Sequence, residues 1–184
     1  MSGPDTGRPQ RFVPNEPFPP YAYVTGRFPH PTRDPSGHSF GHRPSEPPPL
    51  TTENWSISRA YLLGCDLFNY GYYWEAHEVW EGLWQACGRR GTTADFLKGL
   101  IKLAAAGVKA REGRLQGVAR HAARAEILFR GVRSQIASRN YLGLNTDWLM
   151  ELSADLPRHV MPLAGNAPVE IAVDFHLLPA ADDK

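Results

Sequence analysis

Residues 68–84 read FNYGYYWEAHEVWEGLW, a stretch in which ionisable and aromatic side chains recur at helical spacing. An α-helix turns 100° per residue, so His77 and Glu81 lie one turn apart on the same side. Glu78 precedes Glu81 by three residues and Glu75 precedes Glu78 by three, so each lies slightly further round the helix axis. The spacing therefore predicts a helix that presents four ionisable groups in one contiguous arc.

The rest of this helix, which we expect to span residues 73–87, is largely apolar. Its period predicts one side that packs on other helices. We expect the flank beside the ionisable arc to carry Tyr73, Trp80 and Trp84. We expect the opposite, core-facing side to carry Val79, Leu83 and Ala86.

Three carboxylates in such an arc repel one another unless a cation, a proton or a metal ion lies near them. Lysines on one stripe of the next predicted helix offer cations, and a buried network of hydrogen bonds and salt bridges is our main interpretation. The alternative is a divalent metal ion, because imidazole and carboxylate groups one turn apart can chelate one ion. The candidate network or ligand-binding residues are Glu75, His77, Glu78, Glu81, Trp84, Lys98 and Lys102. The candidate metal ligands are His77, Glu78 and Glu81.

The composition on either side of this helix divides the chain into three parts. Thirteen of the 17 prolines lie at or before Pro49, and proline disfavours helix. Residues 1–50 are therefore predicted to form an extended, proline-rich and aromatic arm packed on the core, with a disordered tail at residues 1–10 and 43–49 as the alternative. Residues 51–157 are predicted to form a helical bundle, and residues 158–184 a C-terminal extension with one strand.

Apolar periodicity predicts about five helices, so the expected fold class is all-α. Besides residues 73–87, the helices are expected at 53–69, 94–112, 115–138 and 147–155. Small residues at 104–107 predict that the third helix is the central one. Alternation of apolar and polar residues over 169–177 predicts a strand, with residues 21–24 as its partner.

Two residue runs within this pattern resemble a known family. GYYWEAHEVWEGLW, followed by FLKGLIKLAAA, resembles the domain-of-unknown-function 309 family of small all-helical proteins, over about residues 53–136. The resemblance implies a helical bundle and brings no known activity. Lys98 and Lys102 stand where that family usually has glutamine, a departure that favours pairing between lysine and carboxylate.

Charge is distributed unevenly along the chain although the net charge is only +1. Residues 98–139 carry ten bases and two acids, and arginines crowd the fourth helix. This helix either forms a solvated or internally paired face or binds an anion. No nucleic-acid motif or interleaved aromatic stacking platform accompanies the arginines, so nucleic acid is a disfavoured partner.

Histidines and turn residues gather in the segment 30–42. His30, Arg33, Asp34 and His38 either satisfy turns, which we favour, or close over the His77 helix to complete a site.

Two functions remain open at this stage. The first is a non-enzymatic binding or interaction protein, whose partner is a protein, a small anionic ligand or a second copy of the chain in a homodimer. The second is a small metal- or anion-binding, hydrolase-like enzyme that uses His77 and the glutamate cluster.

The absence of a secretory leader or long apolar run, together with two unpaired cysteines, Cys65 and Cys87, predicts a cytoplasmic protein that does not cross a membrane.

Overall fold

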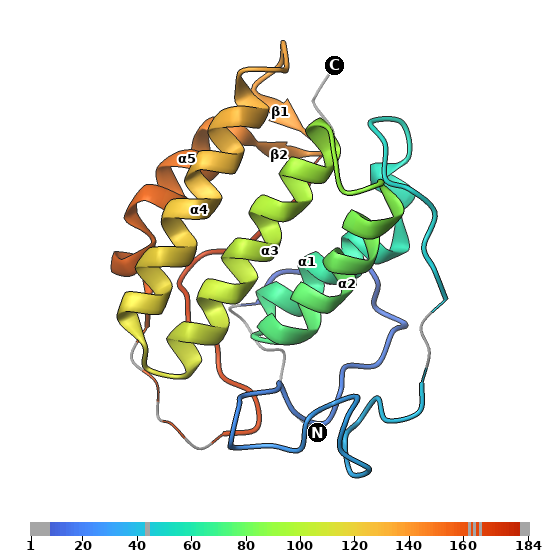
Figure 1. Cartoon of the computed structure of the whole chain (residues 1–184), viewed down its shortest axis with the longest axis vertical. Helices are drawn as coiled ribbons and strands as arrows, with labels where there is room; N and C mark the ends of the chain where they lie inside the picture. Colours follow the sequence, from blue (N-terminus) through green and yellow to red (C-terminus); the bar gives the residue numbers. More distant parts are fainter. Residues whose placement is uncertain (1–7, 43–44, 162, 164, 166, 181–184) are drawn as a thin grey trace.

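The computed structural model of the chain describes residues 8–42, 45–161, 163, 165 and 167–180. The described part is mostly helical, as predicted, with five α-helices and one small antiparallel sheet (Figure 1). The helices are α1 (Arg59–Asn69), α2 (Tyr73–Ala86), α3 (Thr92–Arg111), α4 (Leu115–Arg133) and α5 (Thr146–Asp155). The strands are β1 (Asn140–Tyr141) and β2 (Leu144–Asn145), and short 3-10 turns cover Trp55–Ile57 and Leu156–His159.

The first helix begins later than the apolar pattern predicts. The Ser58 side chain accepts a hydrogen bond from the Tyr61 N–H, so Ser58 is the N-cap and α1 starts at Arg59. The expected start at Glu53 is wrong, and Ile57, which that helix would have buried, is 81 % exposed. A serine cap satisfies one of the free N–H groups of the first turn, which explains the later boundary.

The fourth helix ends earlier than predicted because a hairpin follows it. Asn140 pairs with Asn145 and Tyr141 with Leu144. Leu142 and Gly143 form the turn with φ values of 50° and 80°, the positive angles of a two-residue hairpin turn. The Asn145 side chain then accepts from the Trp148 N–H and caps α5.

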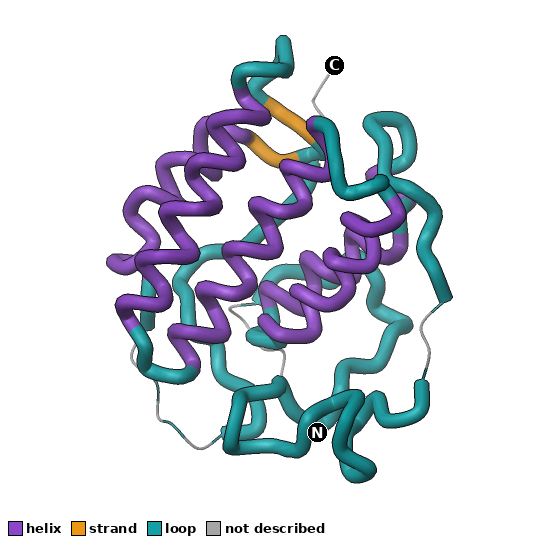
Figure 2. Tube along the Cα trace, in the orientation of Figure 1, coloured by secondary structure: helices purple, strands orange, loops and turns teal. Residues whose placement is uncertain are grey.

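The third helix lies between α2 and α4 (Figures 1 and 2). A Cβ atom at Gly107 would lie 2.5 Å from the Tyr73 ring of α2, and one at Gly99 would lie 2.5 Å from the Phe129 ring of α4. Small residues on α3 therefore let both neighbouring helices approach closely, which confirms its predicted central position.

Residues 8–42 contain turns but no helix or strand, and Figure 2 shows them as loops near one end of the helices. Buried polar groups of α1 and α2 hold their backbone. Asp66 accepts from the N–H groups of Phe12 and Val13 at 2.9 and 2.8 Å, and Glu75 accepts from the Tyr23 N–H at 2.9 Å.

The predicted strand over 169–177 is not formed. Among the described residues, an isolated antiparallel bridge joins Val160 and Val173, and the expected partner near residues 21–24 contributes one backbone hydrogen bond, from the Ala22 N–H to the Pro168 carbonyl. The segment is instead held by side chains, because Asn69 exchanges two hydrogen bonds with Leu177. The apolar residues of this segment pack on helices without forming a sheet, as Phe175 does against Phe68 of α1 and Trp148 of α5.

The close contact at Gly107 gives a stability prediction. Gly107→Ala places a methyl group against the Tyr73 ring, which is 1 % exposed and whose hydroxyl accepts from the Ala172 N–H at 2.8 Å. We expect the free energy of unfolding to fall by about 1–3 kcal/mol, measured by urea denaturation. Gly131→Ala in α4, where an added Cβ meets nothing within 4 Å, is the matched control and should gain up to about 1 kcal/mol. Equal effects of the two substitutions would contradict this packing.

Candidate functional site

The second helix buries a different face from the one predicted. Tyr73, Ala76, Trp80 and Leu83 are 1 % exposed or less. Tyr73 and Trp80 therefore belong to the core, and their predicted place on the flank of the ionisable arc is wrong. The helical period alone allows a large aromatic side chain either in the core or on the flank of the arc. Gly64 of α1 leaves room for Trp80 in the core, because a Cβ on Gly64 would lie 2.1 Å from the Trp80 indole nitrogen.

Three of the four predicted groups come together on the open side of α2. His77 Nδ1 lies 3.3 Å from Glu78 Oε1 and 3.6 Å from Glu81 Oε2. The side chains of His77, Glu78 and Glu81 are 27, 49 and 40 % exposed. His77 Nδ1 itself is buried and has no hydrogen-bond partner among the described residues. We call His77, Glu78 and Glu81 the α2 triad.

Glu75 is separated from the α2 triad. It is 6 % exposed, and its Oε1 accepts from the Tyr23 N–H and lies 3.2 Å from His38 Nε2, whose side chain is also 6 % exposed. The four groups share the predicted arc of α2, but they do not form one cluster, because Glu75 has separate, buried surroundings. Glu75 lies in the first turn of α2, where the N-terminal segment passes and its backbone requires an acceptor.

The lysines of α3 face the open side of α2 without forming ion pairs. Lys98 lies 5.5 Å from the centre of the Trp84 ring, a cation–π contact. Burial lowers the pKa of Lys102, Arg124 and Lys98 lower it further, and Glu81 opposes them. Within the described ranges, neither lysine has a carboxylate oxygen within 4.0 Å. The predicted ion pairs between these lysines and the glutamates are therefore not formed, and Lys102 feels Glu81 only as a longer-range attraction.

A histidine that the sequence did not single out lies among these cations. Burial lowers the pKa of His121 on α4 to about 4, and Lys102, Arg124, Lys109 and Arg120 lower it further. Its Nδ1 is buried and has no hydrogen-bond partner among the described residues. The sequence shows His121 between Arg120 and Arg124, which indicates positive surroundings. It does not show that Lys102 and Lys109 of α3 also lie near this histidine.

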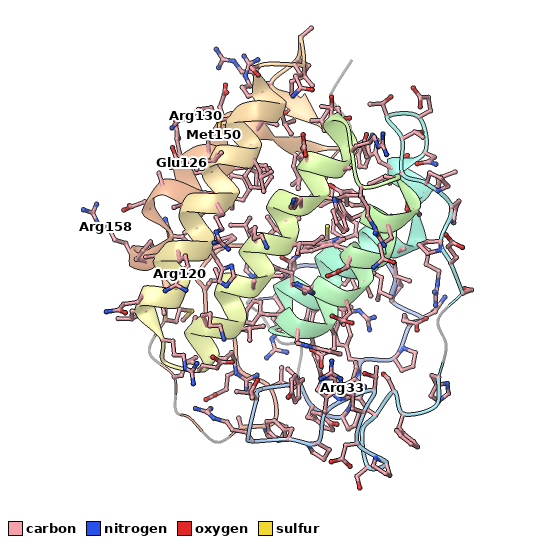
Figure 3. All side chains as sticks on the ribbon, in the orientation of Figure 1. Arg33, Arg120, Glu126, Arg130, Met150 and Arg158 are labelled. Atoms are coloured by element: carbon pink, nitrogen blue, oxygen red, sulfur yellow. The ribbon has the colours of Figure 1, made fainter. Side chains whose placement is uncertain are left out.

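The histidine-rich loop divides between the two predicted roles. Asp34 Oδ1 accepts from the Ser36 N–H and His30 Nδ1 accepts from the Thr32 N–H, so these side chains satisfy turns. His38 instead reaches Glu75 of α2. Figure 3 labels Arg33 at the end of the molecule where this loop lies, far from Arg120 on α4.

Comparison with known proteins identifies one part of the chain. Residues 61–121 match the model of the family described as Domain of unknown function (DUF309). This part of the chain, from α1 into α4, is similar to that family, in agreement with the resemblance found in the sequence. Neither the curated proteins nor the solved structures gave a match. No helix in the described ranges combines the length and apolar character needed to cross a bilayer.

Because Glu75 is buried and the α2 triad is partly exposed, we expect substitutions at the two places to affect stability unequally. Glu75→Ala leaves the Tyr23 N–H and His38 without their acceptor in a buried place, so the free energy of unfolding should fall by about 1–3 kcal/mol. His77→Ala removes a partly exposed side chain without a hydrogen bond at Nδ1 and should change it by about 0.5 kcal/mol or less. Chemical denaturation measures both, and a larger loss for His77→Ala would refute the division.

Proposed function

We propose that this chain is a non-enzymatic binding protein that docks an acidic segment of a partner protein on α3 and α4. The proposed surface consists of Lys98, Lys102, Arg120, His121 and Arg124, and we call it the basic face. The observation that carries the proposal is the lack of compensating acids. Among the described residues, none of its four permanent cations has a carboxylate oxygen within 4.0 Å.

The neighbouring arginines of α4 provide the contrast. Arg130 pairs with Glu126, and Arg133 lies 2.8 Å from Asp147, so the C-terminal half of α4 is internally neutralised. Figure 3 labels Arg120 and Arg130 at opposite ends of α4. Unpaired cations on adjacent helices create a positive potential, which attracts an anionic partner and accelerates its association.

An acidic protein segment fits the basic face better than nucleic acid does. Nucleic-acid sites of low sequence preference interleave cations with aromatic rings on which bases stack. Of the cations on the basic face, only Lys98 contacts an aromatic ring in the described part of the chain. Carboxylates need only charge and hydrogen-bond donors, which lysine and arginine supply.

The exposure of the α2 triad supports binding over catalysis. Catalytic acids and bases usually lie in places that exclude water and shift their pKa values. The carboxylates of Glu78 and Glu81 are 49 and 40 % exposed. The triad therefore lacks the desolvated surroundings expected of a hydrolase.

We also propose that the protein acts in the cytoplasm and that residues 1–50 form one arm packed on the helical bundle of residues 51–157. Cys65 and Cys87 are both free thiols, which suits a reducing compartment. The hydrogen bonds of Asp66 and Glu75 to the described residues 8–42 support the arm. Residues 1–7 and 43–44, which include most of the alternative disordered tail, lie outside the described residues. The separation of residues 158–184 stays a prediction.

Charge reversal on the basic face tests the proposed partner. Lys102→Glu combined with Arg124→Glu should weaken binding of a ten-residue polyglutamate peptide at least about 10-fold, measured by fluorescence anisotropy at low salt. Arg130→Glu combined with Arg158→Glu is the charge-matched control and should retain most of the binding, because these arginines are already paired with Glu126 and Asp155. An oligonucleotide of equal charge should bind more weakly. Tighter binding of the oligonucleotide, or equal loss in both double variants, would contradict the proposal.

The pKa of His121 gives a second readout of the same complex. Because burial and four cations lower this pKa to about 4, neutralisation of those cations by a bound peptide should raise it. In the free protein, the unfolded chain binds a proton at His121 before the folded chain does, so the histidine costs stability as the pH falls from about 6.5 towards 4. An NMR titration of the imidazole in the presence and absence of peptide measures the shift, with His159 as the internal reference.

A second candidate function is the binding of a divalent metal ion by the α2 triad. One ligand atom from each of His77, Glu78 and Glu81 lies within 4.8 Å of the other two. Nitrogen and oxygen ligands from residues one turn apart suit Zn²⁺ and similar ions, and the unbonded His77 Nδ1 is available to coordinate. Three ligands from one helix leave further coordination positions open to water or to a partner carboxylate.

Elemental analysis of protein purified without a histidine tag tests the metal candidate. About one bound Zn²⁺ per chain, and a melting temperature that falls in chelator, should both be lost in His77→Ala. His159→Ala is the matched control, because His159 also lies beside a carboxylate, 2.8 Å from Asp174, but has no second one in reach among the described groups. Metal-free protein whose melting is unchanged by chelator would remove this candidate.

A further inference from the structure

A small cavity lies between the N-terminal segment and the connection from α3 to α4. Its volume is about 260 Å³, and it is lined by Val24, Thr25, Arg27, Lys109, Glu112 and Arg114. Pockets for drug-sized ligands usually have about 300–1,000 Å³, so this cavity suits a smaller group. Three of its six lining residues are cationic and one is anionic.

Tight turns fix both walls of the cavity. The Arg27 N–H donates to the Val24 carbonyl at 3.0 Å, with Gly26 at φ 78°, so the chain reverses over residues 24–27 and directs Arg27 back toward the bundle. Val24 is 1 % exposed and anchors this wall. The turn is a fixed part of the fold although it contains no helix or strand.

The opposite wall is the C-terminal cap of α3. The Arg114 N–H donates to the Lys109 carbonyl and the Gly113 N–H donates to the Ala110 carbonyl, both at 2.9 Å, with Gly113 at φ 70°. This is a Schellman motif, which ends the helix and turns the chain sharply. The motif brings the side chains of Lys109, Glu112 and Arg114 to one wall.

The charges in the cavity do not balance. Glu112 is shared by Lys109 at 2.7 Å and by Arg114 at 3.5 Å. Arg27 donates one N–H group to the Gly165 carbonyl and has no carboxylate within 4.0 Å among the described residues. Three cations and one carboxylate leave an excess of two positive charges.

We propose that this cavity binds a phosphate group as its dianion, either as free phosphate or as the phosphoryl group of a small monoester. Two guanidinium groups offer planar pairs of N–H donors that match phosphate oxygens, and Lys109 adds a compact charge. The Thr25 hydroxyl, which has no hydrogen-bond partner in the described ranges, adds a further donor.

This inference goes beyond the proposed function and uses different residues. The basic face lies on the sides of α3 and α4, whereas the cavity uses Arg27 and Arg114, which lie outside both helices. Lys109 contributes to the positive charge around His121 as well as to the cavity, so it is left unchanged in the test. The two proposals can therefore fail separately.

Isothermal titration with inorganic phosphate at constant ionic strength tests the inference. We expect saturable binding to the full chain, with Kd raised at least about 10-fold in Arg27→Ala and in Arg114→Ala. Both arginines are exposed on the surface, so circular dichroism should confirm an unchanged fold. Arg158→Ala is the matched control, an arginine 83 % exposed beside Asp155, and should bind as the parent chain does.

Two further arms complete the experiment. Glycerol phosphate that binds more tightly than inorganic phosphate identifies a monoester as the ligand, and equal affinity identifies free phosphate. The double variant Lys102→Glu and Arg124→Glu should keep phosphate binding while losing the acidic peptide. No saturable binding of either phosphate compound, or the same Kd in the parent chain, Arg27→Ala and Arg114→Ala, would overturn the inference.

Discussion

Buried polar side chains of α1 and α2 hold the parts of this protein that form no helix or strand. Asp66 and Glu75 accept from backbone N–H groups of the N-terminal segment, and Asn69 and Tyr73 do the same for the C-terminal segment. Backbone groups of irregular segments must find partners when they are buried, and an unpaired one costs free energy comparable to a lost hydrogen bond. The helices therefore provide an apolar core and also the acceptors that order about fifty residues of loop.

This constraint also explains the position of the candidate sites. Glu75 Oε1 is engaged by the Tyr23 N–H and His38, and the side chain is buried beneath the N-terminal segment, although its Oε2 has no hydrogen-bond partner among the described residues. The α2 triad begins two residues later and is partly exposed. The same docking places Arg27 opposite the end of α3 and so forms the basic cavity. On α2, Glu75 therefore stabilises the fold, whereas the α2 triad is the candidate site.

Helical periodicity predicted α2 and α3 within two residues, and small residues predicted the central place of α3. It could not assign Tyr73 and Trp80, because a large aromatic ring satisfies either face until Gly64 and Gly107 are known to lie against it. The hairpin before α5 was missed because Leu142, an unusual residue at positive φ, occupies its turn. The separation of Glu75 from His77 depends on Tyr23, 52 positions earlier, and local spacing carries no information on such contacts.

Amide hydrogen exchange of the native protein measures whether buried side chains of α1 and α2 order the two irregular segments. The N–H groups of Val13, Tyr23, Ala172 and Leu177 lie outside every helix and strand, yet each donates to a side chain of α1 or α2. We expect them to exchange as slowly as core amides of α3, because they open only when the bundle opens. Exchange of these four amides at the rate of exposed loops, while α3 stays protected, would contradict it.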